Sequence, residues 1–134
     1  MFLIDTNIWL ERLLDQERAN EVKDFLEQTP SEKLYMSDFT FHSIGIILGK
    51  LKKIDIFVLL IQDAFVNGAV SLVRVELQDM KRLVEVMDQY RLDFDDAYQY
   101  VVAETHRLTI ISFDSDFDRT SLGRKTPLEV LGVK

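Results

Sequence analysis

Short apolar runs alternate along this chain with segments of helical periodicity. Apolar and β-branched runs bounded by acidic or turn-forming residues predict strands. These runs cover residues 1–4, 34–36, 69–75 and 108–113, and residues 128–131 are predicted as a short fifth strand. Each predicted strand is separated from the next by enough chain for at least one helix, so the pattern predicts crossover connections between the strands.

The segments between the strands carry apolar residues at three- and four-residue spacing, which predicts amphipathic helices. The predicted helices cover residues 7–14, 16–28, 39–50, 54–67, 76–90 and 93–107. Apolar side chains nearly encircle the helix at 54–67, which predicts burial on two sides, within the domain or against a second copy of the chain.

Strands that alternate with helices predict an α/β fold with a mostly parallel sheet of four or five strands. Helices on both faces would make three layers, α/β/α. The chain has 134 residues and shows no repeat, low-complexity tract or linker, so residues 1–134 are predicted to form a single domain.

Composition narrows the functional classes. A net charge of −7 argues against binding nucleic acid through a broad basic surface. The chain has no cysteine, so it has no thiolate zinc site, and this composition fits a reducing cytoplasm. Its longest central apolar run, residues 56–61, is far shorter than the roughly 20 residues of a membrane span, so no membrane partner is expected.

Acidic residues stand where predicted strands end or helices begin. Asp5 follows the first strand, Asp96 opens a helix, and Asp114 and Asp116 follow the fourth strand. Each has an ordinary structural explanation, as a helix cap or a turn former. Taken together they indicate more, because the carboxyl ends of parallel strands lie at one edge of a sheet, where ligands bind.

Carboxylates gathered at one edge repel one another by about 4 kcal/mol for a pair at ~4 Å and intermediate dielectric. A hard divalent cation, Mg²⁺ or Mn²⁺, would hold them together. Such a site is typical of metal-assisted hydrolysis of a phosphodiester. Thr6, Asn7 and Ser112 are candidates for orienting the waters around the ion.

Three segments of the chain resemble a PIN domain, the small α/β ribonuclease fold that includes the VapC-type toxins of toxin–antitoxin pairs. They read Phe-Leu-Ile-Asp-Thr-Asn at 2–7, Asp-Asp-Ala-Tyr at 95–98, and Ile-Ile-Ser-Phe-Asp-Ser-Asp-Phe at 110–117. The resemblance implies that Asp5, Asp96 and Asp114 bind Mg²⁺ or Mn²⁺, with Asp116 as a nearby catalytic acid. It also implies an RNA substrate, a homodimer and an antitoxin partner.

One position departs from the family pattern. PIN domains usually carry a glutamate early in the helix after the second strand, and here that position falls on Ser43, beside His42. The departure motivates an alternative function, a PIN-like module that binds RNA or a partner with weakened or lost cleavage. His42 is a candidate ligand, although a histidine in an apolar helix is more often a packed residue.

Basic residues near the acidic turn suggest a substrate contact and also bear on a competing class of protein. Arg119 and Arg124 follow the acidic turn closely, which makes them the first candidates for contacts with substrate phosphates. A receiver-like domain that accepts a phosphoryl group also places acids at strand ends. That class needs a lysine after a late strand, and Lys125 stands in poor register for that role.

Overall fold

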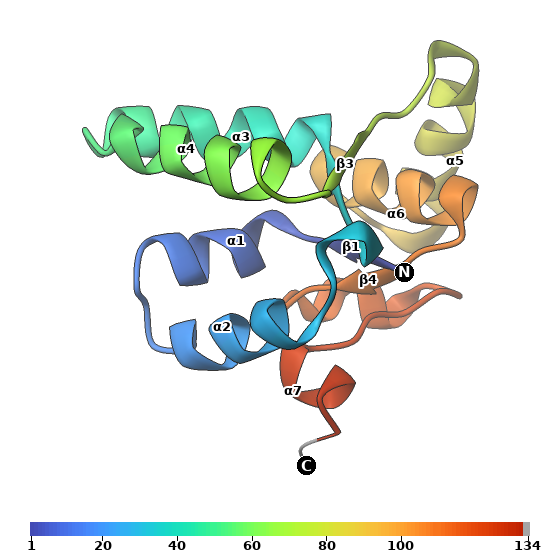
Figure 1. The fold of residues 1–134 in the computed structure, drawn as a ribbon. Coiled ribbons are helices and arrows are strands. Elements are labelled where there is room, and N and C mark those ends of the chain that lie inside the picture. The colour runs from blue at the N-terminus through green and yellow to red at the C-terminus, as the bar shows by residue number, and fades with distance from the viewer. Residues whose placement is uncertain (133–134) are drawn as a thin grey trace.

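The computed structural model describes residues 1–132. Four strands form one parallel sheet in the order β3-β2-β1-β4. The strands are β1 (Phe2–Ile4), β2 (Leu34–Ser37), β3 (Ser71–Val73) and β4 (Thr109–Ile111). The predicted α/β fold with a parallel sheet is confirmed (Figure 1).

Helices fill the connections, close to where the sequence pattern places them. The first four are α1 (Thr6–Leu13), α2 (Ala19–Gln28), α3 (Asp38–Lys50) and α4 (Ile54–Ile61). The later ones are α5 (Met80–Tyr90), α6 (Phe94–His106) and α7 (Pro127–Val130). Short 3₁₀ turns at Ser31–Lys33 (η1), Leu77–Asp79 (η3) and Ser115–Arg119 (η4) complete the connections.

Alternate residues of each strand point to opposite faces of the sheet, and this alternation builds three layers. Leu3 and Ile110 pack with α5 and α6 in one core. Ile4 and Ile111, their neighbours in sequence, pack with α1 to α4 in the other core. Both strands are therefore buried on both faces, which explains why they read as continuous apolar runs.

Residues 128–131 are not a fifth strand, so that prediction is wrong. Thr126 and Glu129 cap each other's backbone in a capping box, and Pro127 occupies the first turn, so the segment forms helix α7 instead. The chain does touch the free edge of β4 just before α7, because Lys125 forms a single parallel bridge with Ile111.

The predicted helix at 54–67 is divided. After α4 the chain continues as a five-residue π-helix, η2 (Gln62–Val66), in which the Asn67 N–H donates to the Gln62 carbonyl at 2.9 Å. Leu60 and Ala64 face the core, whereas Val58 and Leu59 are each 60% exposed. The expected burial on two sides is thus not met within one chain.

Candidate active site

Asp5 lies where β1 meets α1, directly beside the end of β4. Ile4 pairs with Ile111 in the sheet, so the next residues, Asp5 and Ser112, emerge side by side at the carboxyl edge. Asp5 caps α1 by accepting a hydrogen bond from the Thr6 N–H at 2.8 Å. Asp5 therefore caps α1 and also stands at the carboxyl edge of the sheet.

The Asp5 carboxylate is only 6% exposed and accepts four hydrogen bonds. Besides the bond from Thr6, Oδ1 accepts one from Gln99 Nε2 at 2.9 Å. Oδ2 accepts a short bond from Ser112 Oγ at 2.6 Å and a longer one from Asn7 Nδ2 at 3.3 Å. Burial raises the pKa of Asp5, and the bonds from Ser112, Gln99 and Thr6 oppose that rise.

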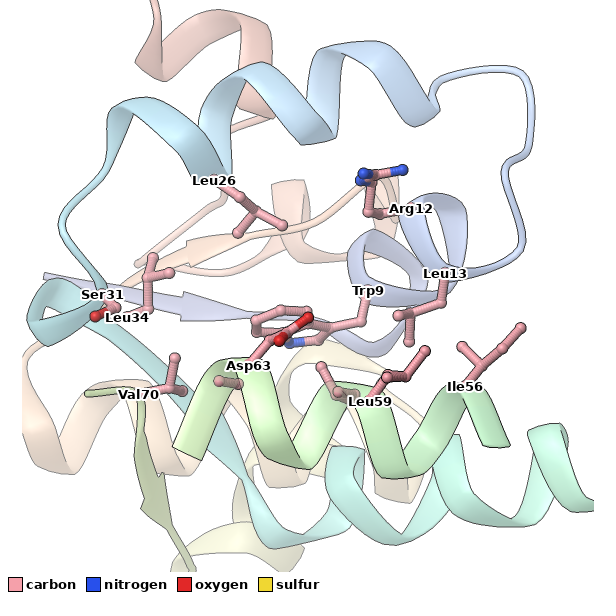
Figure 2. A pocket seen from close by; sticks show the side chains of 12 residues that line it. Trp9, Arg12, Leu13, Leu26, Ser31, Leu34, Ile56, Leu59, Asp63 and Val70 are labelled. Carbon is pink, nitrogen blue, oxygen red and sulfur yellow. The ribbon is translucent and has the colours of Figure 1, made fainter. Parts of the chain in front are cut away.

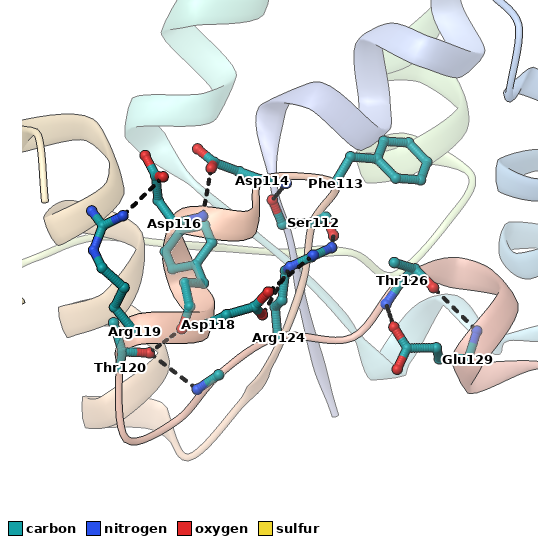
Figure 3. A network of polar contacts seen from close by, with 12 residues as sticks. Ser112, Phe113, Asp114, Asp116, Asp118, Arg119, Thr120, Arg124, Thr126 and Glu129 are labelled. Atoms are coloured by element: carbon teal, nitrogen blue, oxygen red, sulfur yellow. Dashed lines mark hydrogen bonds and ion pairs between the residues drawn. The ribbon is translucent and has the colours of Figure 1, made fainter.

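The polar residues around Asp5 also fix the loop after β4. Asn7 Oδ1 accepts a bond from the Phe113 N–H at 3.1 Å, and its Nδ2 donates to Ser112 Oγ at 3.2 Å. Ser112 Oγ accepts a further bond from the Asp114 N–H at 2.9 Å. These contacts hold Asp114 in place relative to Asp5. Figure 3 shows Ser112, Phe113 and Asp114 in this loop.

Three other carboxylates converge on this edge. Asp96, Asp114 and Asp116 each offer an oxygen, and these oxygens lie within 4.8 Å of one another. Burial, followed by repulsion from Asp114, raises the pKa of Asp96 to about 8. Asp114 also forms the turn of η4, since its Oδ1 accepts the Asp116 N–H at 2.8 Å (Figure 3).

A cavity of about 290 Å³ lies over this edge. It is lined by Asp5, Thr6, Asn7, Leu10, Phe39, Ser43, Ile47, Asp95, Asp96, Gln99 and Asp114. Asp116 does not line it, although its carboxylate belongs to the converging group. Asp96 and Asp114 are common to the cavity and to that group, so they are the best placed of the acids to bind an ion.

The chemistry of these residues fits a divalent cation. Four of the lining residues carry carboxylates, and none of the lining residues is basic. Carboxylate oxygens are hard ligands of the kind that Mg²⁺ and Mn²⁺ prefer. Burial and then repulsion from Asp114 raise the pKa of Asp96, and a bound cation would offset that repulsion.

The family's glutamate has no acidic substitute on α3. Ser43 lines the cavity, whereas His42 is exposed, stands edge-on against Phe41 and is not among the lining residues. Asp38 does not line the cavity either, and its Oδ1 accepts a bond from the Tyr98 hydroxyl at 2.7 Å. His42 is thus a surface residue outside the cavity wall, and not the packed residue that its apolar surroundings in the sequence favour.

Arg119 and Arg124 are both engaged within the protein (Figure 3). Arg119 donates to Asp116 at 3.0 Å and to the backbone carbonyls of Tyr90 and Arg91. Arg124 forms two bonds to Asp118 and one to the Ser112 carbonyl. Their predicted contact with substrate stays a prediction, and these bonds give both guanidinium groups a structural role.

Gln99 was not identified from the sequence, and Asp95 was named only as part of the motif at 95–98. Both line the cavity beside Asp96. A polar residue three positions after Asp96, inside the apolar run from Ala97 to Val102, is the pattern that points to Gln99, because residues i and i+3 share a helix face.

A second and larger cavity, of about 430 Å³, lies away from the acids, between α1 and α2 on one side and α4 on the other (Figure 2). Apolar side chains form most of its lining, and the charged residues Arg12 and Asp63 also line it. Trp9, which lines it, has a buried indole N–H without a hydrogen-bond partner. We call this the apolar cavity.

Comparison with known proteins gives a consistent result. The family model of the PIN domain matches residues 2–122. A toxin–antitoxin complex from Klebsiella pneumoniae contains a chain 24% identical, with a TM-score of 0.75 and 95% of this chain and 98% of that chain covered. No curated protein matches.

Two further solved structures share the fold. VapC20 of Mycobacterium tuberculosis, a Sarcin-Ricin loop cleaving toxin, is 16% identical, with a TM-score of 0.76 and 91% of this chain and 96% of that chain covered. FitAcB from Neisseria gonorrhoeae is 20% identical, with a TM-score of 0.74 and coverage of 95% and 98%. No helix within residues 1–132 is long and apolar enough to cross a membrane.

Proposed function

Because this chain belongs to the PIN domain family, whose members are generally nucleases, we propose that residues 1–134 act as one metal-dependent ribonuclease domain. The observation that carries the proposal is the convergence of Asp5, Asp96 and Asp114 on one cavity from three distant segments. The reaction is hydrolysis of an RNA phosphodiester, with Mg²⁺ or Mn²⁺ as the cofactor.

Asp96 and Asp114 would hold the ion, with Asp5 and Asp116 beside them. When bound, the ion supplies Lewis-acid polarisation of a phosphoryl oxygen and a water of lowered pKa. Around it the protein provides a fixed frame, because Ser112 and Asn7 hold Asp5 through bonds of 2.6 and 3.3 Å. Without a cation the cavity would repel a phosphodiester anion, so substrate binding should itself depend on the metal.

RNA cleavage by the purified chain tests the proposal. Structured and single-stranded RNA should be cut in the presence of Mn²⁺ or Mg²⁺ and left intact in EDTA. Cleavage that persists in EDTA would identify a contaminating nuclease and remove the basis of the assignment. Cleavage by the Asp5→Asn and Asp96→Asn variants at the wild-type rate would do the same.

Ser43 motivates a second candidate function, an RNA- or partner-binding module without efficient cleavage. The Ser43→Glu variant separates the two functions, because it restores a carboxylate to the cavity wall. We expect the wild-type chain to cleave already and the variant to bind Mn²⁺ roughly tenfold more tightly, equal to about 1.4 kcal/mol. His42→Glu, on the exposed side of the same turn, is the matched control and should change Mn²⁺ affinity little.

The two results have distinct meanings. A wild-type chain that cleaves within about tenfold of Ser43→Glu supports the ribonuclease proposal. A wild-type chain that binds RNA without cleaving it, beside a Ser43→Glu variant that cleaves, would establish the binding module instead. The measurements are calorimetric titration with Mn²⁺ and initial rates of cleavage on one RNA.

We also propose an antitoxin protein as partner, supported by the toxin–antitoxin complexes among the structural neighbours. The apolar cavity offers a surface for an apolar segment of that partner, with Arg12 and Asp63 available for polar contacts (Figure 2). Co-purification of the tagged chain with a co-expressed candidate antitoxin tests this proposal. A Leu59→Asp variant that still captures the partner with unchanged affinity would exclude the apolar cavity as its binding surface.

A homodimer is the remaining part of the proposal. Ile54, Val58 and Val66 are more than half exposed along α4 and η2, and a second copy of the chain packed there would cover them. Light scattering on the purified chain gives the mass directly. A monomer at all concentrations up to the millimolar range would overturn the dimer.

A further inference from the structure

Gln99 is a buried amide in the wall of the acidic cavity. It is only 2% exposed and lies on α6, three residues after Asp96. Burial of an amide costs free energy unless its hydrogen bonds are made within the protein. The segment around it, from Ala97 to Ala103, is otherwise apolar or aromatic, so a polar side chain here needs a specific explanation.

The amide nitrogen of Gln99 has two partners. Nε2 donates to Asp5 Oδ1 at 2.9 Å and to Thr40 Oγ1 at 2.8 Å. Beside a bound cation Asp5 would be ionised and its carboxylate would only accept hydrogen bonds, which fits the amide orientation with Nε2 toward Asp5. Both amide hydrogens are thereby used within the protein.

The amide oxygen of Gln99 has no partner. Oε1 is buried and makes no hydrogen bond. Leaving such an acceptor unpaired costs about 1–3 kcal/mol, and native structures rarely retain one without a reason. Gln99 lines the same cavity as Asp96 and Asp114. Its Oε1 is closed to solvent, so a donor that enters the cavity with a ligand would satisfy this oxygen once the amide shifts toward it.

A hydrated divalent cation brings such donors. Mg²⁺ keeps several of its waters when it binds to protein carboxylates, and these waters donate hydrogen bonds to surrounding oxygens. A neutral amide suits the position better than a carboxylate would. It donates to Asp5 on one side and accepts on the other, and it adds no charge to the four acids already present.

We infer that Gln99 is a positioning residue of the metal centre, which clamps Asp5 through its amide nitrogen and accepts a hydrogen bond from a metal-bound water through its amide oxygen. This inference rests on the proposed function, since it needs a divalent ion in the cavity. It assigns to α6 part of the orienting role that the absent glutamate of α3 leaves open.

Direct titration of the full chain with Mn²⁺ tests the inference. Gln99→Met keeps the length of the side chain and removes both polar atoms, and it should weaken Mn²⁺ binding at least tenfold, as loss of an outer-sphere partner does. Gln99→Asn is the second variant. It keeps an amide that is too short to reach Asp5 and Thr40 as before, and it should weaken binding at least fivefold.

Gln89→Met, on the exposed surface of α5, is the matched control and should leave Mn²⁺ affinity unchanged. The midpoint of thermal unfolding in EDTA is the second measurement. A merely structural role would lower that midpoint and leave the dissociation constant for Mn²⁺ as it is. A positioning role changes the dissociation constant in a variant that remains folded.

The outcomes are separable. If the wild-type chain does not bind Mn²⁺, the proposed function fails and the inference fails with it. If the wild type binds and a folded Gln99 variant binds within twofold of it, the inference alone is overturned. Weaker binding in both Gln99 variants, with the Gln89→Met chain unchanged, supports it.

Discussion

Asp96→Asn is expected to lower kcat/KM for Mn²⁺-dependent RNA cleavage by roughly a thousandfold, which corresponds to about 4 kcal/mol of transition-state stabilisation. Asp96 belongs both to the cavity and to the group of carboxylates that converge within 4.8 Å. Asparagine keeps the shape of the side chain and removes its charge, so the ion loses a ligand while α6 should keep its place. Initial rates on one defined RNA, at saturating Mn²⁺, are the measurement.

Asp88→Asn is the matched control, because Asp88 is an exposed residue of α5 and takes no part in the acidic cavity. It should retain the wild-type rate. A folded Asp96→Asn chain that cleaves within tenfold of the wild type would show that Asp96 does not hold the catalytic ion.

Mn²⁺ is expected to stabilise the folded chain strongly. An ion that binds only the folded state adds about 2.7 kcal/mol when its concentration is 100 times the dissociation constant. For a chain of this size that raises the midpoint of thermal unfolding by roughly 10 °C. Differential scanning calorimetry with Mn²⁺ and with EDTA measures the difference, which Asp96→Asn should largely abolish.

The metal-free chain should lose stability as the pH rises. The pKa of Asp96 rises from its ordinary value of 3.8 to about 8 in the folded chain. Between these two values the folded chain keeps a proton that the unfolded chain releases, so the free energy of unfolding falls from about pH 4 to about pH 8. Burial raises the pKa of Asp5 in the same direction.

Asp96→Asn removes one of the two sources of this dependence. In EDTA at pH 8 the variant should therefore be more stable than the wild type, and the two should approach each other near pH 4. Urea unfolding at a series of pH values measures this. A wild-type chain whose stability in EDTA is flat from pH 4 to pH 8 would show that the carboxylates are not crowded as described.

The sheet edge was predictable because its signals are local. Asp5 and Asp114 each stop an apolar run, and parallel strands place such stops together whenever the strands are neighbours. The adjacency of β1 and β4 brings Asp5 next to Ser112. Asp96 is a candidate from its place at the start of a helix, and the PIN resemblance adds its role as a metal ligand.

Features that depend on distant neighbours were not predictable in the same way. Gln99 is buried with its amide hydrogens on Asp5 and Thr40, which lie far away along the chain, and with its oxygen unpaired. The bonds of Arg119 to the carbonyls at the end of α5 equally need the folded chain. By contrast, helix α7 was missed although its capping box was readable in the sequence, because three apolar residues within 128–131 resemble a short strand as much as the helix that Thr126 and Pro127 begin.

The central claim is that the ends of β1 and β4 and the start of α6 together hold a divalent ion. Diffraction from Mn²⁺-soaked crystals, recorded for the anomalous signal of manganese, tests it most directly. The account predicts a peak bonded to carboxylate oxygens of Asp96 and Asp114, with Asp5 beside it. A manganese peak only at other sites, with these carboxylates bound to no ion at saturating Mn²⁺, would contradict the account.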